Sequence, residues 1–385
     1  MMPLQAFATP TKPPELVQDQ PPAWLEARLA ALLDATVIES PTRFRFADLD
    51  PFDLATPGPL QMVDGGRGGL ATRGAPGGFG SHPLAEIMWQ VLYNYAYARS
   101  FWGKAAQLPS GRTELMDPAF IGELRAANHG RQRWDGFWTV QRADRDGSVH
   151  IEKAGNHRKA SAGEYALATG PGRPVTAGDL VSCRVTSEST DSQPGFYFAF
   201  SETVASDHDD GHLVRLYFHL SPAGVPWLLS WLTRDLDRYR VPYRIKCLAQ
   251  PALYDRCDPV VLYVAKRFLQ PLLRILAQHR KALEEHLLPD VPLCSKPLLE
   301  GLGAADEPGN ARSFGQTRSY IIAQGILDAW ASGTDSRDMR LAYTSFRFRQ
   351  LGLSLSQPHL SEGALDRYQW PATVSLEAHS CRQQP

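Results

Sequence analysis

The segment 214–220 reads VRLYFHL and places an arginine, a tyrosine and a histidine at alternate positions. Side chains of a strand alternate between its two faces, so Arg215, Tyr217 and His219 are expected on one face and apolar groups on the other. The apolar face suits a protein core. The polar face carries groups that bind anions and transfer protons, whereas Lys, Glu, Thr and Ser usually fill a merely solvated face. This strand is therefore a candidate for chemistry.

Two further candidate strands have the same pattern. GFYFAF sets Tyr197 against three phenylalanines, and VPYRIKCL sets Arg244 and Lys246 against apolar residues. If the strands lie side by side with their apolar faces aligned, one surface displays Tyr197, Arg215, Tyr217, His219, Arg244 and Lys246. Three formal positive charges on one surface predict an anionic ligand. The alternative is that Arg244 and Lys246 belong to a solvated face and that His219 is a core histidine with satisfied hydrogen bonds.

Two segments further along the chain can add to such a site. YDRCDPV places Arg256 and Asp258 in the turn before another strand, where the aspartate could orient an arginine or cap the turn. SFGQTRSYIIAQGILDAW begins with Ser313 and Gln316 at capping-box spacing, which predicts a helix N-terminus. The backbone N–H groups of a helix start favour anions, and Arg318 lies within its first turns.

Other motifs are weaker. SDHDDGH (206–212) packs two histidines and three aspartates together, but it is typical of an acidic hairpin loop, and we predict no metal site there. The glycine-rich stretch at 57–80 could mimic a phosphate-binding loop, yet no strand-like run precedes it and no GK[ST] follows, which favours a flexible loop. No GxSxG nucleophile motif is present.

Composition limits the class of protein. The chain has 385 residues, 43% hydrophobic and 21% charged, as is typical of a globular protein. A net charge of -1 gives no general attraction to nucleic acid or anionic membranes, so anion binding must be local. Five scattered cysteines without CxxC spacing argue against a disulfide framework and structural zinc. With no candidate membrane span or signal peptide, we predict a cytoplasmic protein.

The periodicity of apolar residues predicts an α+β fold. In chain order we expect a disordered lead-in (1–22), a helical N-terminal subdomain (23–125), an α+β domain (130–355) and a polar tail (356–385). The sheet should be mostly antiparallel and partly mixed, with flanking helices. Helices are expected at about 23–36, 82–103, 222–240, 266–287, 315–333 and 335–351.

The segments PGFYFAF, VRLYFHLSPAGVPWLLSWLT, VPYRIKCL, YDRCDPVVLYV and SFGQTRSYIIAQGI resemble the HopA-type family, named for a bacterial type III secretion effector. Members also occur in biosynthetic clusters for class V lanthipeptides and thioamide-containing peptides. The resemblance covers roughly residues 130–355. It implies a lyase that removes phosphate from phosphoserine or phosphothreonine of a ribosomal precursor peptide, leaving dehydroalanine or dehydrobutyrine, after a separate kinase-like partner has phosphorylated it. No metal or organic cofactor is implied.

The residues suit that reaction. Elimination of phosphate needs a clamp for a dianion, a base for the α-proton, stabilisation of the enolate and, optionally, an acid. Four arginines are expected to form the clamp: Arg215, Arg244, Arg256 and Arg318. Lys246 is the expected base, provided that burial and positive neighbours lower its pKa. His219 is the expected acid, Tyr217 or Tyr197 would bind an enolate or phosphate oxygen, and Asp258 supports an arginine.

A non-catalytic function is the alternative. An effector-like or scaffold protein would bind a phosphorylated peptide or a kinase partner through the same positive surface without changing it. A phosphatase is a third possibility. The mass of a phosphothreonine peptide after incubation distinguishes the three, because elimination, hydrolysis and simple binding leave different products.

Overall fold

The computed structural model confirms the α+β class. Every strand pairing in the described part of the chain is antiparallel, so its sheets have no parallel component. The glycine-rich stretch at 57–80 and most of the predicted lead-in lie outside the described residues. The structure describes residues 19–55, 82–108, 114–153, 155–170, 172–309 and 312–371.

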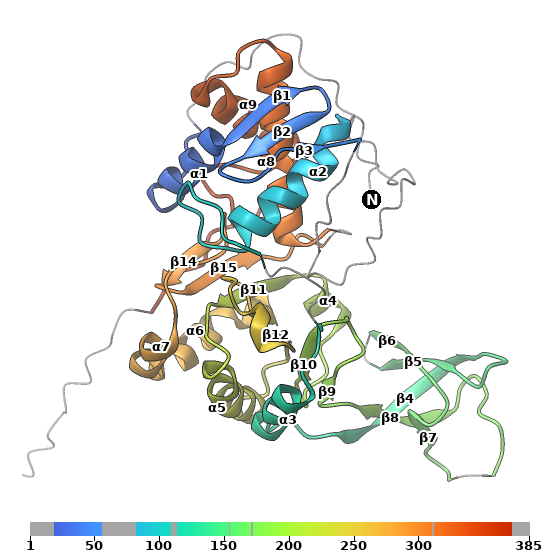
Figure 1. The fold of residues 1–385 in the computed structure, drawn as a ribbon. Coiled ribbons are helices and arrows are strands. Elements are labelled where there is room, and N and C mark those ends of the chain that lie inside the picture. The colour runs from blue at the N-terminus through green and yellow to red at the C-terminus, as the bar shows by residue number, and fades with distance from the viewer. Residues whose placement is uncertain are drawn as a thin grey trace, which may run out of the picture.

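A seven-stranded sheet forms the centre of the molecule (Figure 1). Its strands are, in spatial order, β14 (Lys296–Leu299), β15 (Leu302–Asp306), β11 (Leu213–Phe218), β13 (Val260–Ala265), β12 (Tyr243–Leu248), β10 (Phe196–Phe200) and β9 (Glu188–Ser189). The four strands β10 to β13 were predicted from their β-branched and aromatic residues. Strands β9, β14 and β15 were missed because they are short or, like LGAAD in β15, lack residues that favour strands.

Helices cover both faces of this sheet. The first face carries α3 (Pro118–Ala127), α5 (Gly224–Arg238), α6 (Leu269–Gln278) and α7 (Arg280–His286). The second face carries α2 (Pro83–Leu92), the π-helical turn η1 (Tyr93–Tyr97), α8 (Phe314–Ala331) and α9 (Arg337–Gln350). Val214 and Leu216 of β11 belong to the core on the first face, and Tyr217 to the core on the second. None of the helices among the described residues is both long and apolar enough to span a membrane.

The N-terminal part of the chain joins the C-terminal helices in an upper lobe (Figure 1). It was predicted to be helical, but after α1 (Ala23–Ala35) it forms a small sheet of β1 (Thr36–Ser40), β2 (Arg43–Phe46) and β3 (Phe52–Asp53). The alternating burial of RFRF in β2 is the period of a strand, in a run too short to be recognised. The helix predicted at 82–103 is α-helical only to Leu92 and ends, after the π-helical turn, at Tyr97.

A five-stranded sheet lies to one side with a small core of its own around Trp138 (Figure 1). Its order is β6 (Asn156–Ala160), β5 (Val149–Lys153), β4 (Arg133–Ala143), β8 (Leu180–Val185) and β7 (Tyr165–Leu167).

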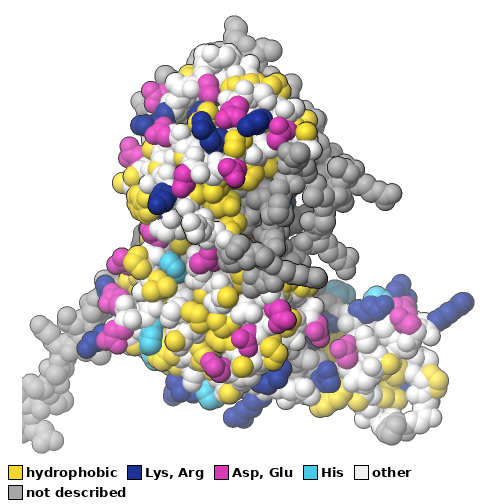
Figure 2. Space-filling view, viewed as in Figure 1, with side chains coloured by type: hydrophobic (Ala, Val, Ile, Leu, Met, Phe, Trp, Pro, Cys, Tyr) yellow, Lys and Arg dark blue, Asp and Glu magenta, His cyan; other side chains and the backbone are white. Residues whose placement is uncertain are grey.

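A four-residue helix, α4 (Asp207–Asp210), lies in the chain between β10 and β11 of the seven-stranded sheet. On the face in Figure 2, acidic and basic side chains are interspersed over the upper lobe, in keeping with the net charge of -1.

Part of the predicted polar tail is packed. Leu360 and Tyr368 are buried, and the Tyr368 hydroxyl donates to Asp306 at 2.6 Å. His359 lies between the rings of Trp24 and Tyr368, with centroid distances of 6.3 and 5.5 Å. Residues after 371 are outside the described part of the chain. Residues 359–368 are therefore a packed structural element of the fold.

Burial lowers the pKa of His359 to about 4, although the nearby Asp366 carboxylate acts in the opposite direction. The unfolded chain, with an ordinary pKa of about 6.5, binds a proton that the folded chain excludes. The free energy of unfolding should therefore fall by up to about 3 kcal/mol as the pH drops from about 6.5 to about 4, and then level off. Urea unfolding at several pH values should show this slope in the wild type and a smaller one in His359→Gln. Equal slopes would contradict the prediction.

Candidate functional site

Strand register creates a polar face at the centre of the seven-stranded sheet. Strand β13 lies between β11 and β12, so Arg215 pairs with Tyr263 and Tyr263 with Arg244. One pleat along, the next row joins Tyr217 to Lys246 through β13. Directly paired residues share a face. Strands β11 and β12 were predicted to display their polar side chains on one surface. They do so, with β13 between them.

A cavity of about 290 Å³ opens on this face, between the sheet and the upper lobe. This first cavity is bounded by the sheet, by the turn before β13, by the π-helical turn and by the start of α8. Five predicted site residues line it: Arg215, Tyr217, Lys246, Arg256 and Asp258. The other lining residues are Tyr93, Tyr97, Gln193, Phe196, Val261, Tyr263, Glu307, Arg312, Ser313 and Gln316.

Two buried arginines of the first cavity are held by carboxylates. Arg215 donates through Nε to Glu307. Arg256 donates through Nε and Nη2 to the two carboxylate oxygens of Asp258, at 2.8 and 3.0 Å, so Asp258 orients an arginine as well as lying in a turn. Nη2 of Arg256 also donates to the Tyr93 hydroxyl at 3.1 Å. Both guanidinium groups thus have fixed positions before a ligand arrives.

Two phenols supply hydrogen-bond donors. Burial raises the pKa of Tyr217, although Arg215 acts in the opposite direction, and burial also raises the pKa of Tyr97. Both phenols are therefore protonated at neutral pH and can donate to an oxyanion. The Tyr97 ring stacks on Tyr93 at 5.1 Å. It also lies against Gly315, where an added Cβ would meet a ring carbon of Tyr97 at 2.3 Å, so only glycine permits this approach.

Lys246 is half-buried, and its Nζ lies 3.7 Å from the centroid of the Phe196 ring. The face of an aromatic ring attracts an ammonium group, so this contact stabilises the charged form of the lysine. Arg215 and Arg256 in the same cavity oppose that form because like charges repel, but their paired carboxylates, on Glu307 and Asp258, weaken this repulsion. The Phe196 ring therefore favours the charged form of Lys246, whereas the nearby arginines favour the neutral form.

The start of α8 lies at the rim of the first cavity. Its predicted capping box is confirmed, because Ser313 Oγ accepts from the Gln316 amide and the Gln316 side chain accepts from the Ser313 amide. The arginine at this rim is Arg312, which stacks over the Tyr320 ring at 4.2 Å and lies 3.4 Å from Glu86 Oε1. Sequence reasoning missed Arg312 by looking inside the helix. Its position directly before the capping serine was the available signal.

The prediction that Arg318 lies at this rim is wrong. The side chain is 2% exposed and donates to the backbone carbonyls of Pro358 and Leu360, at 2.7 Å each. Burial lowers its pKa to about 10, so it remains charged at neutral pH. Its donors hold the C-terminal segment against α8, which is the physical reason why the helix carries an arginine at this position.

His219 is not among the residues that line the first cavity. It follows the end of β11, where its amide donates to the Gly301 carbonyl. The imidazole Nδ1 faces the backbone carbonyl of Pro289. Burial lowers the pKa of His219, so the ring is mostly neutral at neutral pH. Its position and its charge both disfavour the predicted role as an acid in this cavity.

Tyr197 lies on the opposite face of the sheet, so its predicted place beside Lys246 is wrong. The register pairs Tyr197 with Cys247 and places Phe198 opposite Lys246. The Tyr197 hydroxyl donates to Glu188 at 2.9 Å and accepts from Asn128 at 3.1 Å. Arg244 shares the polar face but lines the neighbouring cavity.

Within the described residues, no group of three or more His, Cys, Asp or Glu side chains could hold a metal ion. In the acidic run at 206–212, Asp209 is buried and accepts from Nε and Nη2 of Arg267 at 2.6 and 2.8 Å. Asp209 therefore connects α4 to the short 3-10 helical turn (Lys266–Phe268) that follows β13. The ligand chemistry of the first cavity rests on arginine, lysine and tyrosine side chains.

The similarity to known proteins is concentrated in one segment. The HopA1 effector protein family matches residues 187–360. This range confirms the expected resemblance for β9 to α9, whereas residues 130–186, which we expected to share it, lie outside. No curated protein matches the chain.

Two solved structures of Pseudomonas syringae effector proteins are similar to the chain. The effector from pv. tomato strain DC3000 is 14% identical, with a TM-score of 0.39, and the alignment covers 73% of this chain and 91% of the effector. The effector from pv. syringae strain 61 is 15% identical, with a TM-score of 0.39, and the alignment covers 71% and 89% respectively.

Proposed function

We propose that the protein is a phosphopeptide lyase. It would act in the cytoplasm on a ribosomal precursor peptide phosphorylated by a kinase-like partner, and would form dehydroalanine or dehydrobutyrine during maturation of a lanthipeptide-type or thioamide-containing peptide. The observation that carries the proposal is the first cavity, where two fixed arginines, a lysine and protonated phenols surround a space of about 290 Å³. The family match supports the proposal without specifying an activity.

The reaction assigns a task to each group. Arg215 and Arg256 bind the phosphate dianion, which guanidinium groups fit through paired N–H donors. Neutral Lys246 takes the α-proton, and the electrons of the Cα–H bond pass through an enolate into the new Cα–Cβ double bond. The Cβ–O bond breaks, and phosphate leaves with its electron pair. The Tyr217 phenol donates to the enolate oxygen and the Tyr97 phenol to the departing phosphate.

No separate acid is assigned in this scheme, because the arginines and phenols can stabilise the phosphate as it leaves. The demanding step is removal of the weakly acidic α-proton. Lys246 must lose its own proton first, and Arg215 and Arg256 favour that loss to the extent that Glu307 and Asp258 leave their charges uncompensated. The contact with the Phe196 ring opposes the loss of this proton. The fraction of Lys246 that is neutral therefore depends on the charges present when the peptide is bound.

A binding function is the second candidate. The carboxylates of Glu307 and Asp258 already neutralise two arginines, and the Phe196 ring stabilises a charged Lys246. Such a cavity would hold a phosphorylated side chain without abstracting a proton. In this second candidate function, charged Lys246 binds the phosphate together with Arg215 and Arg256.

Mass spectrometry of a phosphothreonine peptide incubated with the protein tests the proposal. A lyase should yield a product one water lighter than the unphosphorylated peptide, together with free phosphate. Recovery of the unphosphorylated mass would identify a phosphatase. An unchanged peptide that nevertheless binds would identify the binding function, and either of these outcomes overturns the lyase.

A further inference from the structure

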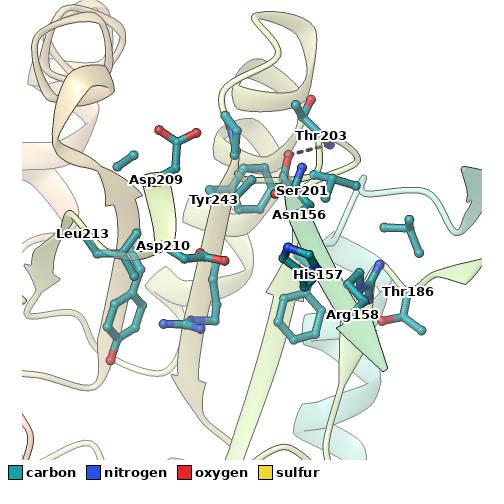
Figure 3. Close-up of a pocket in the computed structure, with 18 residues that line it drawn as sticks. Asn156, His157, Arg158, Thr186, Ser201, Thr203, Asp209, Asp210, Leu213 and Tyr243 are labelled. Carbon is teal, nitrogen blue, oxygen red and sulfur yellow. Dashed lines mark hydrogen bonds between the residues drawn. The ribbon is translucent and has the colours of Figure 1, made fainter. Parts of the chain in front are cut away.

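A second cavity, of about 360 Å³, adjoins the first. Tyr263 lines both, so the two cavities meet at this side chain on the polar face of the sheet. One wall of the second cavity comes from β6, which contributes Asn156, His157 and Arg158. Figure 3 shows His157 and Arg158 across the cavity from Leu213 and Asp210.

Positive charge exceeds negative charge in the second cavity. Arg244 is half-buried against the Tyr263 ring, with its guanidinium carbon 4.6 Å from the ring centroid. In the part of the chain that the structure describes, neither Arg244 nor Arg158 has a carboxylate within ion-pair distance. The lining residue Asp209 is neutralised by its two bonds to Arg267, which leaves Asp210 as the remaining carboxylate of the lining.

The spacing of the two cavities fits an extended peptide. The guanidinium carbons of Arg215 and Arg244 lie 5.1 and 4.6 Å from the same ring centroid of Tyr263, and are therefore less than about 10 Å apart. An extended chain rises about 3.3 Å per residue, and side chains two positions apart face the same way. A residue two positions from one held by Arg215 can therefore reach Arg244.

We propose that the second cavity is a subsite for an acidic side chain two positions from the phosphorylated residue. This inference rests on the proposed function, because it takes the first cavity as the phosphate site. The β6 wall belongs to the five-stranded sheet, which lies outside the segment that matches the HopA1 effector protein family. The subsite is thus assembled from both parts of the chain, and its preference is not a property of the matched segment alone.

Binding of labelled phosphothreonine peptides, measured by fluorescence anisotropy, tests the subsite independently of turnover. The peptides carry Glu, Gln or Lys two positions before or after the phosphothreonine. The wild type should bind the best Glu peptide about tenfold more tightly than its Lys counterpart, as expected for a charge-assisted hydrogen bond. Arg244→Gln should remove this preference, and Arg244→Glu should reverse it.

Arg238→Glu is the matched control. Arg238 is exposed at the end of α5 and lines neither cavity, and its substitution changes the net charge equally. A shift of preference in this control as large as that in Arg244→Glu would reveal a long-range charge effect and overturn the subsite.

The remaining outcomes separate the two proposals. Phosphate-dependent binding without any effect of the flanking charge overturns the subsite and leaves the lyase intact. The expected preference without elimination supports the subsite and overturns the lyase. Failure of every phosphopeptide to bind overturns both.

Discussion

Lys246→Arg is expected to bind phosphopeptide within about tenfold of the wild type, or about 1.4 kcal/mol, while elimination falls at least about 100-fold. Arginine retains the positive charge and most of the length, but it cannot lose a proton near neutral pH. The α-proton then has no acceptor among the groups assigned to the reaction. Single-turnover rates of product formation, together with affinities measured by anisotropy, give the two quantities separately.

Lys266→Arg provides the control for this change of residue type. Lys266 lies after β13, outside both cavities, and donates to both carboxylate oxygens of Asp306 at 3.0 Å, a contact that arginine can reproduce. Elimination by this variant should match the wild type. If Lys246→Arg also eliminates at the wild-type rate, Lys246 is not the base and the reaction must be reassigned to another group.

Arg318→Met should destabilise the fold by about 2–6 kcal/mol. The carbonyls of Pro358 and Leu360 would lose their buried donor, and each unsatisfied group costs about 1–3 kcal/mol. Urea unfolding measures this loss. The molecules that remain folded should bind phosphopeptide with unchanged affinity, because the arginine holds the C-terminal segment and does not face the first cavity.

The double variant Arg215→Gln, Glu307→Gln should show the opposite behaviour. It removes a buried ion pair without leaving one charge unpaired, so the free energy of unfolding should change much less than in Arg318→Met. Affinity for phosphopeptide should fall by about 1.5–3 kcal/mol, whereas binding of the unphosphorylated peptide should barely change. Loss of phosphopeptide affinity in Arg318→Met, and not in the double variant, would restore Arg318 as the clamp.

The strands at the centre of the sheet could be predicted because each repeats its pattern with period 2. That period identifies the two faces of one strand. It does not show which face of the neighbouring strand lies on the same side of the sheet. Strand β10 is the clearest case, since four of its five residues are buried and nothing in FYFAF distinguishes core from cavity. Tyr197 was therefore placed on the wrong face, whereas Arg215 and Lys246, on strands with clear polarity, were grouped correctly.

Contacts between distant parts of the chain were beyond sequence reasoning. Tyr93 and Tyr97 lie in an aromatic helix that could equally have packed in a core, and Glu307 follows a strand that was not recognised. The helix start at Ser313 was predicted from local capping, because a capping box is a short-range signal. Whether Arg312 or Arg318 faces the first cavity depends on how α8 packs, and the C-terminal segment that receives Arg318 was expected to be a loose tail.

The close approach of Tyr97 to Gly315 has a consequence for the order of events during synthesis. A chain emerging from the ribosome presents the π-helical turn first and the strands of the seven-stranded sheet next, and α8 follows all of them. Until then Tyr97 lacks the helix backbone against which its ring packs, and the first cavity lacks the wall formed by Ser313 and Gln316. The nascent protein thus contains Arg215, Lys246 and Arg256 before the first cavity is enclosed, and the capacity to retain a phosphorylated side chain arises only after α8 has been synthesised.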